Sequence, residues 1–170
     1  MKKGFTLIEL LVVVLIIGIL TAAAVPQYQK AVMRTRYATL KKLTQSIATA
    51  QEVYYLKNNE YSTEFDNLDI QMPAGQKAPH SVPSKYYYDW GNCWLTSGNA
   101  SIVTCKNTLS NLEFGINLDQ SGVLPGTRKC VARGSSDLNS LQAQICKAET
   151  GQTDPENVVE GDSSTWRYKD

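Results

Sequence analysis

The sequence predicts an α+β protein in which a long N-terminal helix packs against a small antiparallel β-sheet with a disulfide-tied C-terminal region. Three observations lead to this class: a 21-residue apolar run at 5–25, a helical pattern that continues from it, and aromatic, β-branched segments further along. A chain of 170 residues is the size of one domain. We expect a leader at 1–4, a membrane-spanning helix at 5–26, an amphipathic helix at 27–57 and a globular head at 58–170.

The apolar run carries a single charge, Glu9. At about 1.5 Å per residue a helix of this length spans roughly 31 Å, enough to cross a hydrocarbon core of about 30 Å. A carboxylate at the centre of a membrane costs about 2.5–3.5 kcal/mol, so such a residue is expected to have a partner. Glu9 is therefore the first candidate functional residue.

The stretch GFTLIELLVVVLIIGIL resembles the prepilin signature of type IV pilins and of the related secretion pseudopilins. The similarity consists of a short basic leader ending in Gly4, then Phe5, then Glu9 as the fifth residue of the mature chain. Gly18 and Pro26 lie where type IVa pilins carry helix-loosening residues, so they are the candidates for helix flexibility.

The resemblance implies a pilin fold and a set of processing steps. A prepilin peptidase/methyltransferase would cleave between Gly4 and Phe5 and methylate the new amine of Phe5. Glu9 would then pair with the Phe5 amine of a neighbouring subunit as the chains form a helical filament. The chain would begin in the inner membrane, with its N-terminus cytoplasmic and its head periplasmic, and end in an extracellular pilus.

By the same resemblance, the partners are further copies of the chain, an assembly platform, an ATPase and an outer-membrane secretin. The implied function is that of a structural subunit of a type IV pilus, serving adhesion, motility or DNA uptake. A minor pilin or a type II secretion pseudopilin is the first alternative. An exported or membrane-anchored binding domain is a remoter one.

An ordinary signal peptide is a rival interpretation of the first 25 residues, with Ala22-Ala23-Ala24 as its cleavage site. Glu9 argues against it, because a charge in the apolar region has no purpose there. A helical pattern that continues beyond residue 25 also argues against a signal peptide. We expect this helix to end at Asn58-Asn59 and its apolar stripe to be interrupted at Arg36. That stripe consists of Tyr28, Val32, Leu40, Leu43, Ile47, Ala50 and Tyr54.

The head is expected to begin with a loop at 60–84 and to continue as three or four antiparallel strands within 85–124. Aromatic residues cluster in these strands, and we expect them to alternate between the core and a half-exposed sheet face. A carbohydrate platform or an electron path is the alternative role. The cluster consists of Tyr86, Tyr87, Tyr88, Trp90 and Trp94.

Four cysteines occur without a CxxC pair and with a single histidine, His80, so no metal site or cofactor is expected. In an exported chain two disulfides are the better interpretation. Three connectivities are possible, and the local pairing is favoured because it closes two short loops. That pairing joins Cys93 to Cys105 and Cys130 to Cys146.

Towards the C-terminus, Ser136 or Asp137 is a candidate cap of a short helix, and residues 164–168 (STWRY) are a candidate last strand. Residues 154–162 (DPENVVEGD) form an acidic segment, better interpreted as solvated than as a calcium site. A basic cluster surrounds Cys130, but nucleic acid is an unlikely partner because the cluster is small. It consists of Arg128, Lys129 and Arg133.

Charge is unevenly distributed along the chain. Residues 27–57 hold six basic side chains and one acidic one, a net charge of +5, whereas residues 58–170 hold nine basic and 14 acidic ones, a net charge of −5. These are either two solvated faces or a source of attraction between neighbouring subunits. No catalytic constellation is present, because one histidine completes no triad and no glycine-rich phosphate loop follows a strand, so the chain is not expected to be an enzyme.

Overall fold

The computed structural model describes residues 4–77, 84–134, 136–159 and 162–169. Its chain forms two compact units, Met1–Thr35 and Arg36–Asp170, which are considered separately below. His80, which the sequence marks as a surface residue of a proline-rich loop, lies outside the described residues.

Helix α1 (Leu7–Asn58) is a single continuous α-helix that contains both Gly18 and Pro26. The predicted helix over 5–57 is thereby confirmed. Its end also lies where the sequence predicts it, since Asn59 has a left-handed φ of 57°. The amide of Asn59 donates to the carbonyl of Tyr55 at 2.7 Å, and asparagine tolerates this conformation better than most residues.

The buried face of α1 lies in its second half and differs from the predicted stripe. The expected interruption around Arg36 is wrong, because Tyr37 is fully buried one position later while Arg36 and Tyr28 are exposed. Tyr37 tolerates burial because its hydroxyl lies 3.1 Å from that of Tyr168, a partner far away in the sequence. The face consists of Tyr37, Leu40, Thr44, Ile47, Ala48 and Gln51.

A single antiparallel sheet forms most of the second unit, in the order β1-β2-β3-β4-β5-β6-β8-β7. Of the three or four strands predicted within 85–124, the structure has four, β2 to β5, and the whole sheet is larger than predicted. Its remaining strands are very short or carry charges that hide their alternation. The strands are β1 (Gln76–Lys77), β2 (Lys85–Tyr88), β3 (Gly91–Thr96), β4 (Ile102–Asn107), β5 (Leu112–Asn117), β6 (Arg128–Arg133), β7 (Asn157–Val159) and β8 (Ser163–Arg167).

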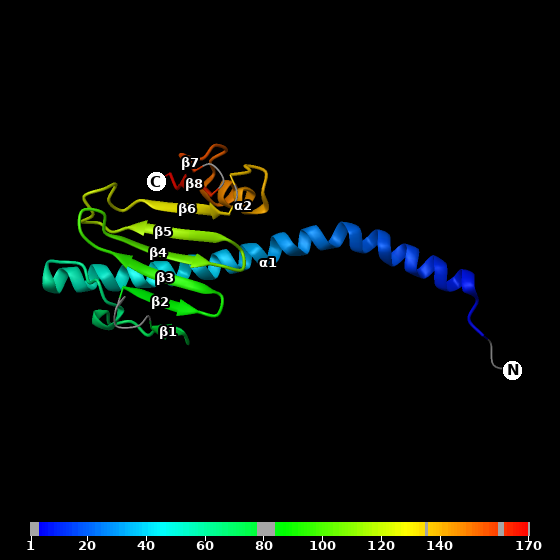
Figure 1. The fold of residues 1–170 in the computed structure, drawn as a ribbon, viewed down its shortest axis with the longest axis horizontal. Helices are drawn as coiled ribbons and strands as arrows, with labels where there is room; N and C mark the ends of the chain where they lie inside the picture. The colour runs from blue at the N-terminus through cyan, green and yellow to red at the C-terminus, as the bar shows by residue number, and fades with distance from the viewer. Residues whose placement is uncertain (1–3, 78–83, 135, 160–161, 170) are drawn as a thin grey trace. The chain divides into compact units, whose positions relative to one another are not determined.

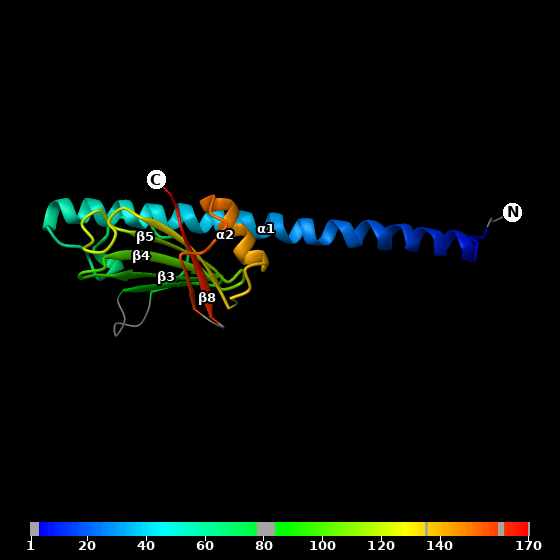
Figure 2. The ribbon, with the colours of Figure 1, turned by 90° about the horizontal axis from the view of Figure 1, so that it is seen from above.

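One face of the sheet packs on the second half of α1, which lies behind the strands in Figure 1 and above them in Figure 2. The ring of Tyr37 meets that of Phe114 edge to face, with centroids 6.0 Å apart. Leu112, Val103 and Trp166 are also buried. Side chains alternate along a strand, so the residues that flank each of these in its own strand point to the opposite face of the sheet. As predicted, Tyr86 and Tyr88 are buried while Tyr87 between them is exposed.

Both disulfides follow the local pairing that the sequence favours. Cys93 and Cys105 are directly opposed on β3 and β4, and their bond joins two neighbouring strands. Cys130 on β6 is bonded to Cys146 on helix α2 (Leu141–Thr150). The second bond therefore ties the helix to the sheet.

The N-cap of α2 is Ser140, whose hydroxyl accepts from the amide of Ala143 at 3.2 Å. The prediction of Ser136 or Asp137 as the cap is wrong because the chain turns once more before the helix begins. In that turn the carboxylate of Asp137 accepts from the amide of Asn139 at 2.9 Å. The predicted last strand is confirmed as β8.

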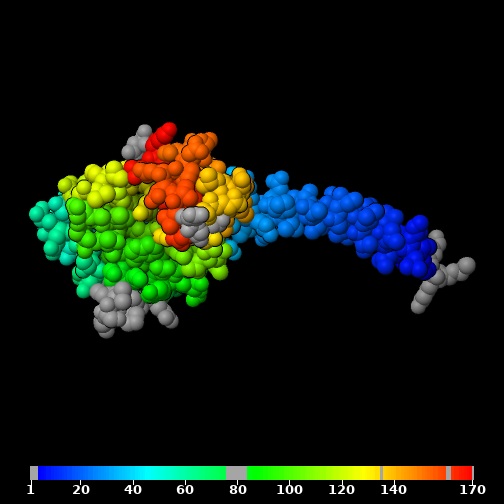
Figure 3. Space-filling view, turned by 45° about the horizontal axis from the view of Figure 1, so that its top comes forward, coloured from blue at the N-terminus to red at the C-terminus, as the bar shows by residue number. Residues whose placement is uncertain are grey.

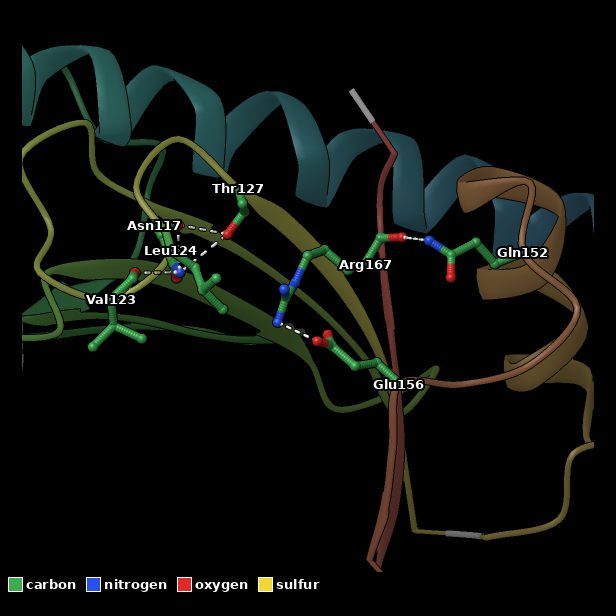
Figure 4. Close-up of polar contacts among 7 residues, drawn as sticks. All are labelled: Asn117, Val123, Leu124, Thr127, Gln152, Glu156 and Arg167. Atoms are coloured by element: carbon green, nitrogen blue, oxygen red, sulfur yellow. Dashed lines mark hydrogen bonds and ion pairs between the residues drawn. The ribbon is translucent and has the colours of Figure 1, made fainter.

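Side-chain hydrogen bonds hold the connections around β5 and β8 (Figure 4). The side-chain amide of Asn117 donates to the carbonyls of Val123 and Leu124 at 2.9 and 3.0 Å, and so closes the loop after β5. Near the C-terminus, Arg167 forms an ion pair with Glu156 at 2.6 Å, and the side-chain amide of Gln152 donates to the Arg167 carbonyl.

The buried tyrosines predict that stability falls at alkaline pH. Burial raises the pKa of Tyr37 well above its usual value, and burial together with Glu52 raises the pKa of Tyr61 to about 12. A raised folded-state pKa contributes stability that is fully present below the unfolded value of about 10 and is lost as pH rises through the folded value. Urea unfolding of the full chain in detergent, followed by circular dichroism between about pH 8 and 12, measures this loss.

Tyr37→Phe and Tyr61→Phe are the matched variants for this measurement. Each is expected to flatten the alkaline decline, because phenylalanine has no hydroxyl to ionise. An unchanged slope in both variants would show that other groups control the alkaline stability.

Candidate assembly site at the start of helix α1

The candidate site lies at the N-terminal end of α1, where Gly4, Phe5 and Thr6 precede the first helical residue, Leu7. Phe5 is 79% exposed, and every described residue up to Gln29 is exposed as well. This segment is long and apolar enough to cross a membrane, by length and composition alone. Within one chain, this apolar surface is therefore available to lipid or to other helices.

Glu9 and Thr6 hold each other by three hydrogen bonds. The amide and the hydroxyl of Thr6 both donate to Oε2 of Glu9, at 2.9 and 2.6 Å. In return the Thr6 hydroxyl accepts from the amide of Glu9 at 3.3 Å. This reciprocal arrangement is a capping box, in which threonine precedes the helix and glutamate is its third residue.

The capping box gives Glu9 a role inside its own chain. Its carboxylate satisfies an amide at the helix start that has no intrahelical partner, and its negative charge lies at the positive end of the helix dipole. Both effects reduce the cost of a carboxylate in an apolar segment. Thr6 is a site residue that the sequence analysis missed, although the pattern Thr-x-x-Glu at residues 6–9 predicts a capping box.

Replacing Thr6 with valine is expected to loosen the start of α1. Valine has nearly the same shape but no hydroxyl, and the loss of an N-cap costs about 0.5–2 kcal/mol. Amide hydrogen exchange of Leu7 to Leu10 in micelles measures the change. Thr6→Ser, which keeps the hydroxyl, is the control and is expected to retain the protection. Equal exchange in the valine variant and the parent chain would contradict the role of the hydroxyl.

Gly18 and Pro26, the candidates for flexibility, both lie inside the continuous helix. A Cβ added at Gly4 or Gly18 would meet no atom within 4 Å, so neither glycine is required by packing within the described chain. Their roles in cleavage and in flexibility are taken up below as proposals.

The basic cluster around Cys130 does not form one free patch. Arg133 donates to Glu113 at 2.9 Å and to Asp162 at 3.3 Å, and its bond to Glu113 raises the pKa of Arg133. Arg128 lies over the ring of Tyr168, 5.4 Å from its centroid. Two of the three cations are thus committed to intramolecular contacts.

The acidic segment is partly neutralised in the same way, since Glu156 and Asp162 pair with arginines. Within the described ranges, no group of three or more His, Cys, Asp or Glu side chains is placed to hold a metal ion. Glu160 of this segment lies outside those ranges.

Comparison with known proteins bears on this N-terminal segment first. Residues 1–25 match the family model of the prokaryotic N-terminal methylation motif. The chain is 47% identical over 126 residues to the type IV major fimbrial protein FimA of Dichelobacter nodosus, which covers 65% of this chain and 81% of that protein. No solved structure matches the chain.

Two further relatives show how broad the similarity is. The type IV major pilin protein PilA of Myxococcus xanthus is 27% identical over 144 residues, which covers 82% of this chain and 63% of the relative. The type II secretion system core protein G of Pseudomonas aeruginosa is 33% identical over 99 residues, which covers 54% of this chain and 70% of the relative. The chain spans only about half, 48%, of a fimbrial protein from P. aeruginosa.

The capped apolar helix, the antiparallel sheet and the methylation motif define a protein of the filament-forming class with a pilin fold. Its similarity to FimA, over most of that relative's length, is specific enough to assign the family. The chain belongs to the type IV pilin family.

Proposed function

We propose that this chain is a structural subunit of a type IV pilus. The observation that carries the proposal is the exposed apolar first half of α1. The capping box of Thr6 and Glu9 lies at its start, and the methylation motif covers residues 1–25. Apolar side chains that are exposed in one chain are expected to be covered by lipid before assembly and by neighbouring helices after it. The family relatives named as major pilins and fimbrial proteins support the same function.

Processing is proposed to occur between Gly4 and Phe5, followed by methylation of the Phe5 amine. Cleavage creates a cation next to an apolar helix, and methylation leaves it positive. Among the described contacts of Glu9, both side-chain bonds from Thr6 use Oε2, so Oε1 is left to accept from the amine of a neighbouring subunit. The pair would neutralise two charges in an apolar environment.

The proposed partners are further copies of the chain, the prepilin peptidase/methyltransferase, an assembly platform, an ATPase and an outer-membrane secretin. The chain would wait in the inner membrane, with its N-terminus cytoplasmic and its head periplasmic, and leave it for an extracellular fibre. Gly18 and Pro26 would allow α1 to bend during this step, because a glycine weakens the helix and a proline removes a backbone hydrogen bond.

The similarity to a type II secretion core protein supports a second candidate, a pseudopilin, and a minor pilin would be made by the same steps. An exported or membrane-anchored binding domain is a remoter candidate, because it leaves the methylation motif at residues 1–25 without a purpose. None of these candidates is an enzyme.

Deletion of the gene in its own bacterium separates the candidates. A major pilin is expected to form most of the protein in sheared surface fibres, and its loss is expected to remove the fibres. Fibres that persist in near-normal amount would indicate a minor pilin. Intact fibres together with failed protein secretion would indicate a pseudopilin.

A further inference from the structure

A hollow of about 310 Å³ lies in the outer face of the sheet, on the side away from α1. That face is turned towards the viewer in Figure 1, and β8 crosses the direction of β3 and β4 in Figure 2. Figure 3 shows the C-terminal segment, coloured orange to red, standing beside the green strands on the surface. The hollow is lined by Lys85, Asn92, Trp94, Lys106, Glu113 and Arg133.

The strand register brings these residues together. Asn92, Lys106 and Glu113 form one row across β3, β4 and β5, and Lys85 lies opposite Trp94 in the next row. Opposed residues on one sheet face are neighbours, and diagonal ones lie about 7–8 Å apart, within reach of long side chains. Trp94 therefore shares its surroundings with lysines from two strands.

The hollow is basic on a head that is acidic. Its lining holds three cations, Lys85, Lys106 and Arg133, against one carboxylate, Glu113, whereas residues 58–170 have a net charge of −5. Of the three, Arg133 is committed to Glu113 and Asp162. Within the described part of the chain, neither lysine has an ion-pair partner, so both charges are available to a ligand.

A fourth cation lies beside the hollow because β5 carries a glycine. A Cβ on Gly115 would come within 2.6 Å of Cε of Lys129, so the absent side chain lets Lys129 lie across the sheet face. Lys129 likewise has no ion-pair partner among the described residues. The glycine thus extends the basic surface towards β6.

Two further residues of the lining, Trp94 and Glu113, indicate which class of anion the hollow accepts. Trp94 is half-exposed, and a flat indole packs well on the C–H face of a sugar ring. Glu113 is only 3% exposed and accepts a hydrogen bond from Arg133 at 2.9 Å, so its charge is already balanced within the chain and does not oppose an anionic ligand. Nucleic-acid sites use several stacking rings along a basic groove, whereas the lining of this hollow holds one ring, Trp94.

We propose that this hollow binds an acidic polysaccharide, one uronate sugar stacking on Trp94 while Lys85 and Lys106 hold its carboxylate. Asn92, which is partly exposed in the same lining, binds a sugar hydroxyl. The volume lies at the lower end of the range of about 300–1,000 Å³ that ligand pockets occupy, which suits one or two sugar rings. Of the aromatic residues considered for a carbohydrate role, Trp94 is the one that lines the hollow. Tyr86 and Tyr88 are buried in the core.

The test uses the full chain in detergent, so it does not depend on filament formation. Calorimetric titration with oligogalacturonate is expected to show binding that weakens with added salt, because surface charges are screened within about 8 Å at physiological ionic strength. Maltohexaose, which is neutral, is expected not to bind at the same concentration. Oligothymidylate, an anion whose internal sugars have no free hydroxyl, is expected to bind at least tenfold more weakly.

Lys106→Gln and Trp94→Leu are each expected to weaken oligogalacturonate binding about tenfold, the size of one charge-assisted bond or one stacking contact. Lys147→Gln on α2 and Trp90→Leu, whose ring stacks on Tyr88, are matched controls away from the hollow and are expected to bind as the parent does. Circular dichroism checks that each variant is folded. Equal binding of maltohexaose, tighter binding of oligothymidylate, or unchanged binding in both test variants would overturn the proposal.

Discussion

Replacing Glu9 with alanine is expected to abolish filament assembly while leaving cleavage after Gly4 largely intact. The variant removes the carboxylate that would pair with the Phe5 amine of a neighbour, and removing one partner of a buried ion pair costs about 3–5 kcal/mol. A filament repeats this loss at every subunit, so the effect is expected to be complete. Immunoblots of sheared fibres and of membranes measure assembly and processing separately.

The capping box requires a control for this variant, because Glu9→Ala also removes a helix cap. Glu9→Gln retains an acceptor for Thr6 but carries no charge. If charge pairing dominates, the glutamine variant is expected to fail in assembly as the alanine variant does. Normal filaments from Glu9→Ala, or full rescue by glutamine, would contradict the pairing of charges.

Replacing Cys130 and Cys146 together with serine is expected to have the next largest effect. The bond closes a 16-residue separation, for which the chain-entropy model gives about 3 kcal/mol. It is also the covalent link between α2 and β6, so the loss should be concentrated in α2. Urea unfolding of the full chain in detergent gives the global change, and hydrogen exchange in Leu141–Thr150 gives the local one.

The pair Cys93 and Cys105 provides the matched control. Its separation of 12 residues predicts a similar global loss of about 3 kcal/mol, but its two strands are also held together by the backbone ladder of β3 and β4. Protection of α2 is expected to survive in this variant. Equal loosening of α2 in both double variants would show that the Cys130–Cys146 bond has no special role there.

The fold elements with local signals were predictable from the sequence. Apolar periodicity locates α1, Asn58-Asn59 marks its end, and segments rich in aromatic and β-branched residues locate β2 to β5. Tyr37 was missed because its burial depends on Tyr168, a contact between residues far apart in the sequence. The cap of α2 was misplaced because several residues close together before the helix, among them Ser136, Asp137 and Ser140, are all good caps.

The candidate site was predictable only in part. Glu9 stands out because a single charge in an apolar run requires a partner, yet its nearest partner is Thr6 of the same chain. The hollow on the sheet was not predictable, because its lining comes from five strands and only the register brings Lys106 close to Trp94. In the sequence the same residues are scattered charges of an acidic head.

The processed N-terminus is the measurement that tests the filament account most directly. Protein recovered from the cell surface is analysed by intact mass and by sequencing of its N-terminal peptide. A chain that starts at Phe5 and carries one added methyl group is the predicted result. A chain that starts near Val25 would contradict it, because it would have lost Glu9 and the whole apolar half of α1 as an ordinary signal peptide.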